Sequence, residues 1–149
     1  VEVTPVYSED DEAWQVGVST ILDYDFPVQV TIQLDNVGGP SAGLMFALGI
    51  IDTMTPGELT SGRQIAGTGT ITADGAVGPI GGIRQKLYGA RDAGSDYFLA
   101  PEANCGEVVG HVPSGLRVFS VGELDDAILA LDTLREGGDL GALETCTAP

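Results

Sequence analysis

The segment 37–43 constrains the fold of this chain more than any other stretch, because three glycines, a proline and a serine directly precede a long apolar run over 44–51. Pro40 suits the first position of a helix, where its missing N–H costs nothing. We therefore expect Ser41 in the first turn of a helix that runs to about Asp52. This helix is apolar nearly all round, a pattern typical of buried helices.

Ser41 has two interpretations at this position. It lies beside unpaired N–H groups at the positive end of a helix dipole, which suits a nucleophile whose reaction develops an oxyanion. Serine is also favoured at ordinary helix starts. The stretch alone leaves both interpretations open.

The charge balance excludes some classes of partner. Six lysines and arginines stand against 22 acidic residues in 149, a net charge of −16, which argues against nucleic acids and anionic membrane surfaces. No apolar run reaches the roughly 20 residues of a membrane span, and no signal peptide is visible. The chain opens on a strand-like pattern, so we expect a domain cut from a longer protein.

Hydrophobic periodicity predicts strands before it predicts interleaved strands and helices. Two glycines in the strand at 64–72 indicate close backbone approach, Asp74-Gly75 indicates a hairpin turn, and Gly94 is expected to end a helix. We expect an α+β fold, with mixed sheets and packed helices, or a small α/β layer architecture. The predicted strands are 1–7, 14–20 (pairing with the first), 28–34, 64–72, 76–80, 97–100 and 116–121, and the later helices are 83–93 and 122–134.

Three further predictions concern the domain bounds, metal binding and the two cysteines. We expect one domain over 1–136 and a tail over 137–149 with little reason to be ordered. Asp23 and Asp25 are interpreted as a turn, so no metal site is predicted. Cys105 and Cys146 are two unrelated thiols or a disulfide that ties the tail down, and a disulfide would imply an oxidising compartment.

A serine nucleophile needs a base, and Lys86 is the strongest candidate. On a helical wheel Lys86 falls between Ala90 and Ala93, on the small-residue side that we expect to face the core. A lysine there can extend its stem out to solvent, or remain buried, where the neutral amine is favoured and can act as a base.

Other candidates are weaker. His111, the single histidine, is interpreted as an exposed loop residue. Thr68 can hydrogen-bond to either Ser41 or Lys86, or be an ordinary strand threonine. The string Gly39-Pro-Ser-Ala-Gly43 matches the G-x-S-x-G elbow of α/β-hydrolases, but Pro40 disfavours that geometry and the chain is short for that fold.

Five segments taken in order resemble the proteolytic domain of the Lon family of serine proteases, over 28 to about 134. They are Gly38-Gly-Pro-Ser-Ala-Gly43, Ala66-Gly-Thr-Gly-Thr-Ile71, Gly78-Pro-Ile-Gly-Gly-Ile-Arg-Gln-Lys86, Ala90-Arg-Asp-Ala-Gly94 and Phe98-Leu-Ala-Pro101.

The resemblance implies a serine–lysine dyad that hydrolyses peptide bonds without a cofactor. It places the nucleophile at Ser41, the base at Lys86 and the supporting threonine at Thr68. Backbone groups at Gly39, Pro40 and Ala42 would stabilise the oxyanion. Arg84 stands where the family often has a lysine, which leaves Lys86 as the only lysine of the motif.

Thr70 stands where ATP-dependent members usually have glutamate, which is similar to bacterial Lon-like proteins that have a PDZ domain and lack the ATPase. The resemblance therefore implies ATP-independent cleavage of protein or peptide substrates, homo-oligomers, and an anchor that holds the protein on the outer side of the bacterial cell membrane. The alternative is a weakly active or inactive Lon-like domain that binds peptides as a scaffold.

Overall fold

The computed structural model describes residues 3–16, 27–32 and 39–147, which belong to two compact units, Val1–Thr31 and Ile32–Pro149. In the first unit, strands β1 (Val6–Ser8) and β2 (Ala13–Gln15) pair antiparallel. Tyr7 lies opposite Trp14, with their ring centroids 5.3 Å apart in an edge-on arrangement. The predicted hairpin is confirmed, although residues 3–5 and 16 form no strand. Residues 1–2 and 17–20 of the predicted strands lie outside the described residues.

The predicted strand at 28–34 is wrong over its described part. Residues 28–32 form no strand, and Val28, Val30 and Ile32 are all about half exposed. A strand needs a hydrogen-bonded neighbour as well as alternating side chains, and no strand pairs with 28–32 in the described part of the chain. Residues 33–34 lie outside the described residues.

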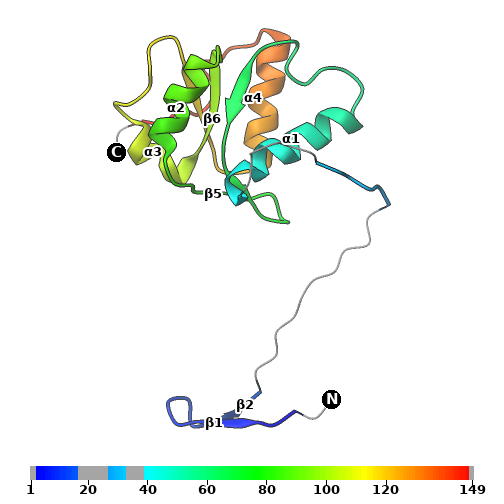
Figure 1. Cartoon of the computed structure of the whole chain (residues 1–149), viewed down its shortest axis with the longest axis vertical. Helices are drawn as coiled ribbons and strands as arrows, with labels where there is room; N and C mark the ends of the chain where they lie inside the picture. The colour runs from blue at the N-terminus through cyan, green and yellow to red at the C-terminus, as the bar shows by residue number, and fades with distance from the viewer. Residues whose placement is uncertain (1–2, 17–26, 33–38, 148–149) are drawn as a thin grey trace. The chain divides into compact units, whose positions relative to one another are not determined.

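The second unit is built around three parallel strands in the order β3-β6-β7 (Figure 1). They are β3 (Ile65–Gly67), β6 (Tyr97–Pro101) and β7 (Arg117–Val121). The central strand β6 reads as a continuous apolar run because both of its faces are buried.

Alternation along β6 divides the core into two layers. Phe98 and Ala100 pack with helix α2 (Ile83–Asp92), whereas Leu99 packs with helices α1 (Gly43–Met54) and α4 (Leu124–Glu136). Figure 1 shows α2 on one side of the sheet and α1 with α4 on the other. Helices packed with several small sheets match the predicted mixture, while the finer assignment to the α+β class stays a prediction.

Helix α1 is less buried than its composition predicts. Leu44 and Leu48 are buried, but Gly49 and Met54 are exposed and the other apolar residues are half-buried. A helix on the outside of a layered domain contacts the core through one stripe only. The expectation of an all-round buried helix is therefore wrong for the described part of the chain.

Turns and helix ends follow the glycine pattern. Strands β4 (Thr70–Ile71) and β5 (Val77–Gly78) pair antiparallel around the predicted Asp74-Gly75 turn. Gly94 follows the last residues of α2 at φ +90°, and Gly137 ends α4 at φ +69°, as left-handed residues after a helix should.

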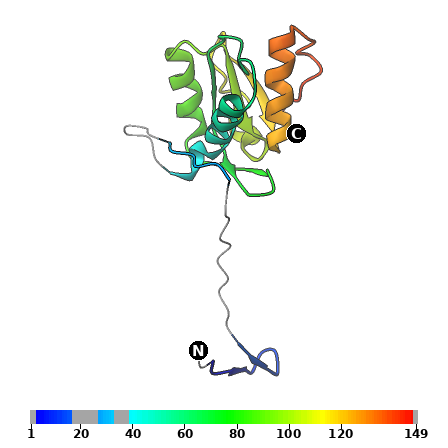
Figure 2. The same cartoon turned by 90° about the vertical axis from the view of Figure 1, so that its right-hand side faces the viewer.

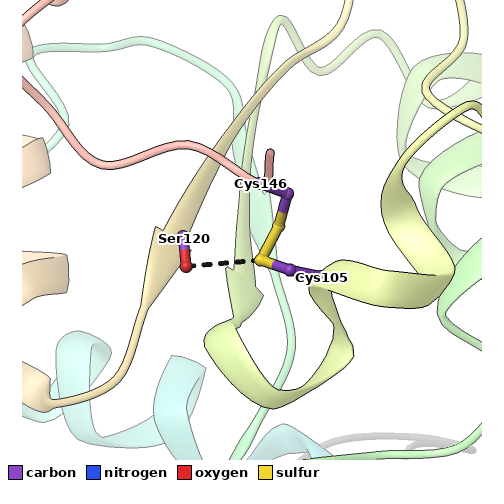
Figure 3. Close-up of a disulfide and its surroundings, with 3 residues drawn as sticks. All are labelled: Cys105, Ser120 and Cys146. Carbon is purple, nitrogen blue, oxygen red and sulfur yellow. Dashed lines mark hydrogen bonds between the residues drawn. A yellow bond between two sulfur atoms is a disulfide. The ribbon is translucent and has the colours of Figure 1, made fainter. Parts of the chain in front are cut away.

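The C-terminal segment is ordered against the domain, contrary to expectation. After β6 come a 3₁₀ turn η2 (Glu102–Asn104) and the short helix α3 (Cys105–Val108). Cys146 forms a disulfide with Cys105 (Figure 3), and the amide of Ser120 donates to the carbonyl of Glu144 at 2.9 Å. Leu140 and Leu143 pack on the core. None of the helices in the described ranges is long and apolar enough to cross a membrane.

Candidate active site

Ser41 lies at the start of a helix, as predicted. Pro40–Ala42 form a 3₁₀ turn, η1, that continues directly into α1. Pro40 is the first residue of η1. Gly39 precedes it at φ +96°, which only glycine adopts without strain. Ser41 is half-buried, and the N–H groups of such a first turn have no partner within the helix. Pro40 has no N–H, so it cannot donate to an oxyanion; Gly39, Ser41 and Ala42 can.

The backbone of Ser41 is held by the segment that follows β3. The carbonyl of Ser41 accepts hydrogen bonds from the Thr68 hydroxyl and from the Gly69 amide, each at 2.8 Å. The Leu44 amide donates to the Gly69 carbonyl at 3.1 Å. Thr68 is only 2% exposed. The serine is therefore fixed through its main chain, while its hydroxyl stays free of these contacts.

Close approach of β3 to α1 depends on glycine, as the strand pattern predicted. A Cβ on Gly67 would lie 2.5 Å from Met45 Sδ and 3.1 Å from Leu99 Cβ. A Cβ on Gly69 would lie 2.8 Å from Val77 and 3.3 Å from Leu44. Small residues here let the two elements approach closely enough for Thr68 to reach Ser41.

Lys86 is exposed, so the expectation that it faces the core is wrong. The buried residues of α2 are Ile83, Leu87 and Ala90, and Ala93 beyond them is exposed too. The buried stripe of α2 is narrower than the helical wheel predicted, and Lys86 lies outside this stripe. Its side chain takes the solvent-directed course that is ordinary for lysine.

No hydrogen bond joins Ser41 to Lys86 among the residues that the structure describes. The two residues nevertheless come from helices that start at the same end of the domain, where the β4–β5 turn also lies (Figures 1 and 2). The arrangement thus presents a serine with a fixed backbone on one side of the sheet and an unburied lysine on α2, which covers the other side. Thr68 contacts the serine of this pair and makes no hydrogen bond to the lysine.

The other candidates make local contacts. The Nδ1 atom of His111 lies 3.0 Å from the Val109 carbonyl in its own loop. The loop position is as predicted, but the residue is half-buried and not exposed. Arg84 donates through Nε to the Glu107 carbonyl at 3.3 Å. Thr70 lies beside Gly78 in the β4–β5 pair.

Sequence reasoning missed Asn104, which is 2% exposed and hydrogen-bonded to the backbone of Ile80. Asparagine in a loop usually lies at the surface, and nothing in the local pattern of 101–109 indicates burial. The signal is tertiary, because the partner residue is 24 positions away.

Residues 28–132 match the family model of the Lon protease (S16) C-terminal proteolytic domain. This match covers more than half of the chain, so the chain belongs to the Lon family of peptidases as a proteolytic domain.

Three relatives show the extent of the similarity. Lon protease 1 of Sorangium cellulosum is 38% identical over 65% of this chain, Lon protease 1 of Thermus thermophilus 34% over 80%, and Lon protease 1 of Bacillus subtilis 33% over 70%. The chain spans only 12%, 15% and 14% of their lengths, respectively.

Proposed function

We propose that the chain is an ATP-independent serine endopeptidase in which Ser41 is the nucleophile and Lys86 the general base. Neutral Lys86 removes the hydroxyl proton as Ser41 Oγ attacks the peptide carbonyl. Amides of the η1 turn stabilise the oxyanion. The resulting ammonium protonates the leaving amine, and water then releases the acyl group from Ser41 by the reverse proton transfers.

The clamp on the Ser41 carbonyl carries this proposal. Thr68 and Gly69 fix the backbone at the helix start and leave the serine hydroxyl available. Holding a nucleophile in one geometry is a large part of catalysis. Membership of a peptidase family gives the reaction class, and the exposed Lys86 supplies an amine on a helix that starts at the same end of the domain.

The finer assignments rest on the motif around Thr70 and on the disulfide. Thr70 and the Gly67–Ile71 motif support the Lon-like type with a PDZ domain and no ATPase. The disulfide supports an oxidising compartment, hence a position outside the bacterial cell membrane with an anchor in the full-length protein. Substrates are unfolded or partner-delivered proteins, self-association is expected, and the acidic surface favours basic or neutral peptides by steering alone.

A cleavage assay on casein tests the function. Activity should be equal with and without Mg-ATP, and Ser41→Ala and Lys86→Ala should each abolish it, while His111→Ala should not. An inactive His111→Ala variant beside an active Lys86→Ala variant would refute the dyad. Activity that requires ATP would refute the ATP-independent type while leaving the dyad intact.

A second candidate is a peptide-binding domain that cleaves weakly or not at all. The observation that favours it is the exposed Lys86 without a hydrogen bond to Ser41. Catalytic hydrogen bonds are often loose before substrate binds, so the two candidates differ in turnover. Saturable binding of casein peptides with no Ser41-dependent product would establish the binding function.

A further inference from the structure

Asn104 is a buried side chain whose polar atoms are all engaged. Its Oδ1 accepts from the Ile80 amide at 3.0 Å, and its Nδ2 donates to the Ile80 carbonyl at 3.0 Å and to Glu107 Oε1 at 3.1 Å. One acceptor and two donors match what an asparagine amide offers. The Asn104 side chain is thus hydrogen-bonded to both the amide and the carbonyl of Ile80, which lies 24 positions away in the chain.

Ile80 directly precedes the start of the helix that carries Lys86. Gly81 and Gly82 follow, and Gly82 is the left-handed N-cap of α2 at φ +71°, with no side chain capping that helix. The Gly82 carbonyl accepts the amide of Lys86 itself at 3.2 Å. Two successive glycines leave this connection with great conformational freedom. The Asn104 contacts restrict the residue at its upstream end.

Helix α2 is also attached to the core by apolar packing that does not involve Asn104. Ile83, Leu87 and Ala90 are buried against β6 and β7. These contacts keep the helix on the sheet, whereas Asn104 fixes where the first turn begins. Loss of Asn104 should therefore move the helix start while leaving the helix packed.

We propose that Asn104 is a positioning residue for Lys86, acting through Ile80 and the Gly81–Gly82 connection. The inference rests on the proposed function, since Lys86 must be the base. A shift of about 1 Å at a catalytic group can cost around a hundredfold in rate. Asn104→Ala should lower kcat at least tenfold with KM changed less than threefold, because the substrate-binding surface keeps its shape.

The test compares Asn104→Ala with Leu134→Ala well below the unfolding temperature of each. Leu134 is 2% exposed in the other core layer and is remote from Ile80, so its truncation lowers stability without affecting the Lys86 helix. Amide exchange of Ile80 by NMR should be slow in the wild type and fast in Asn104→Ala. Leu134→Ala should keep its kcat.

Asn104→Asp gives a second route if the alanine variant fails to fold. It keeps the acceptor for the Ile80 amide, loses both donors and places a carboxylate beside Glu107. Adding Glu107→Gln removes the repulsion and supplies a donor, so the double variant should recover part of the lost kcat. The recovery of kcat should be accompanied by slower amide exchange at Ile80.

Four results would overturn the inference. Rapid amide exchange at Ile80 in the wild type would show that Asn104 does not hold the Ile80 backbone. Normal kcat in a folded Asn104 variant with fast Ile80 exchange would show that Asn104 does not position Lys86. An equal loss of kcat in Leu134→Ala would reduce the role of Asn104 to stability. An active Lys86→Ala variant would instead refute the proposed function, and the inference with it.

Discussion

The hydroxyl of Thr68 donates a 2.8 Å hydrogen bond to the main-chain carbonyl of Ser41 while the threonine itself is 2% exposed. A buried hydroxyl that loses its partner, or a carbonyl that loses its donor, costs the free energy of desolvation. The pair therefore couples the stability of the domain to the geometry of the candidate nucleophile.

Thr68→Val should remove this bond without changing the volume of the side chain much. We expect a loss of about 1–3 kcal/mol in the free energy of unfolding, together with a lower kcat. Denaturant unfolding and casein cleavage measure the two effects. Thr133→Val is the matched control, because Thr133 makes a similar bond to Leu129 on the surface of α4. Unchanged cleavage by Thr68→Val would show that the hydrogen bond from Thr68 to the Ser41 carbonyl does not contribute to catalysis.

Lys86→Arg should abolish cleavage and leave stability unchanged. A guanidinium stays protonated in proteins, so the substituted side chain cannot take the hydroxyl proton of Ser41. The expected loss is roughly 10²- to 10⁴-fold, the usual contribution of a general base. Gln85→Arg places the same side chain at an exposed neighbouring position as a control. Retained activity in Lys86→Arg would exclude proton abstraction by this residue.

Local chemistry made part of this site predictable from sequence. Pro40 and Gly39 constrain their own backbone angles, so the helix start at Ser41 follows from residues adjacent in the chain. Gly67 and Gly69 indicated close approach because a strand rarely contains glycine without a neighbour pressing on it. The helix start is therefore a local feature, whereas the glycines of the strand indicated that something approaches without indicating that Met45 and Leu99 do so.

The features that the sequence did not reveal depend on packing between distant segments. The wheel of α2 could not say how wide its buried stripe is, because that width depends on how much of the helix β6 and β7 cover. Lys86 was therefore placed on the wrong side. The burial of Asn104 likewise depends on Ile80, which comes near only once the sheet has formed.

Gly67→Ala should destabilise the domain. The added methyl would meet Met45 Sδ at 2.5 Å and Leu99 Cβ at 3.1 Å, and although the methionine can turn away, Leu99 belongs to the central strand. We expect a cost of roughly 1–3 kcal/mol, the usual range for overpacking.

Gly49→Ala is the matched substitution for Gly67→Ala, because nothing lies within 4 Å of its would-be Cβ inside α1. It should stabilise the domain by about 0.5–1 kcal/mol through helix propensity. Urea unfolding measures the free energy of unfolding of both variants against the wild type. Equal effects of the two substitutions would contradict the close approach of β3 to α1.

Reduction of the Cys105–Cys146 disulfide should loosen the C-terminal segment first. The bond closes a loop across 41 positions and holds the segment whose Glu144 carbonyl accepts the Ser120 amide. Loop closure of this kind contributes about 2–4 kcal/mol, and Leu140 and Leu143 would lose their anchor on the core. A reductant should therefore lower the unfolding temperature of the wild type and speed amide exchange at Ser120. The double variant Cys105→Ser/Cys146→Ser should unfold at that lower temperature with or without the reductant. A wild type with the same unfolding temperature in both conditions would show that the apolar contacts and the Ser120–Glu144 hydrogen bond hold the segment without the disulfide.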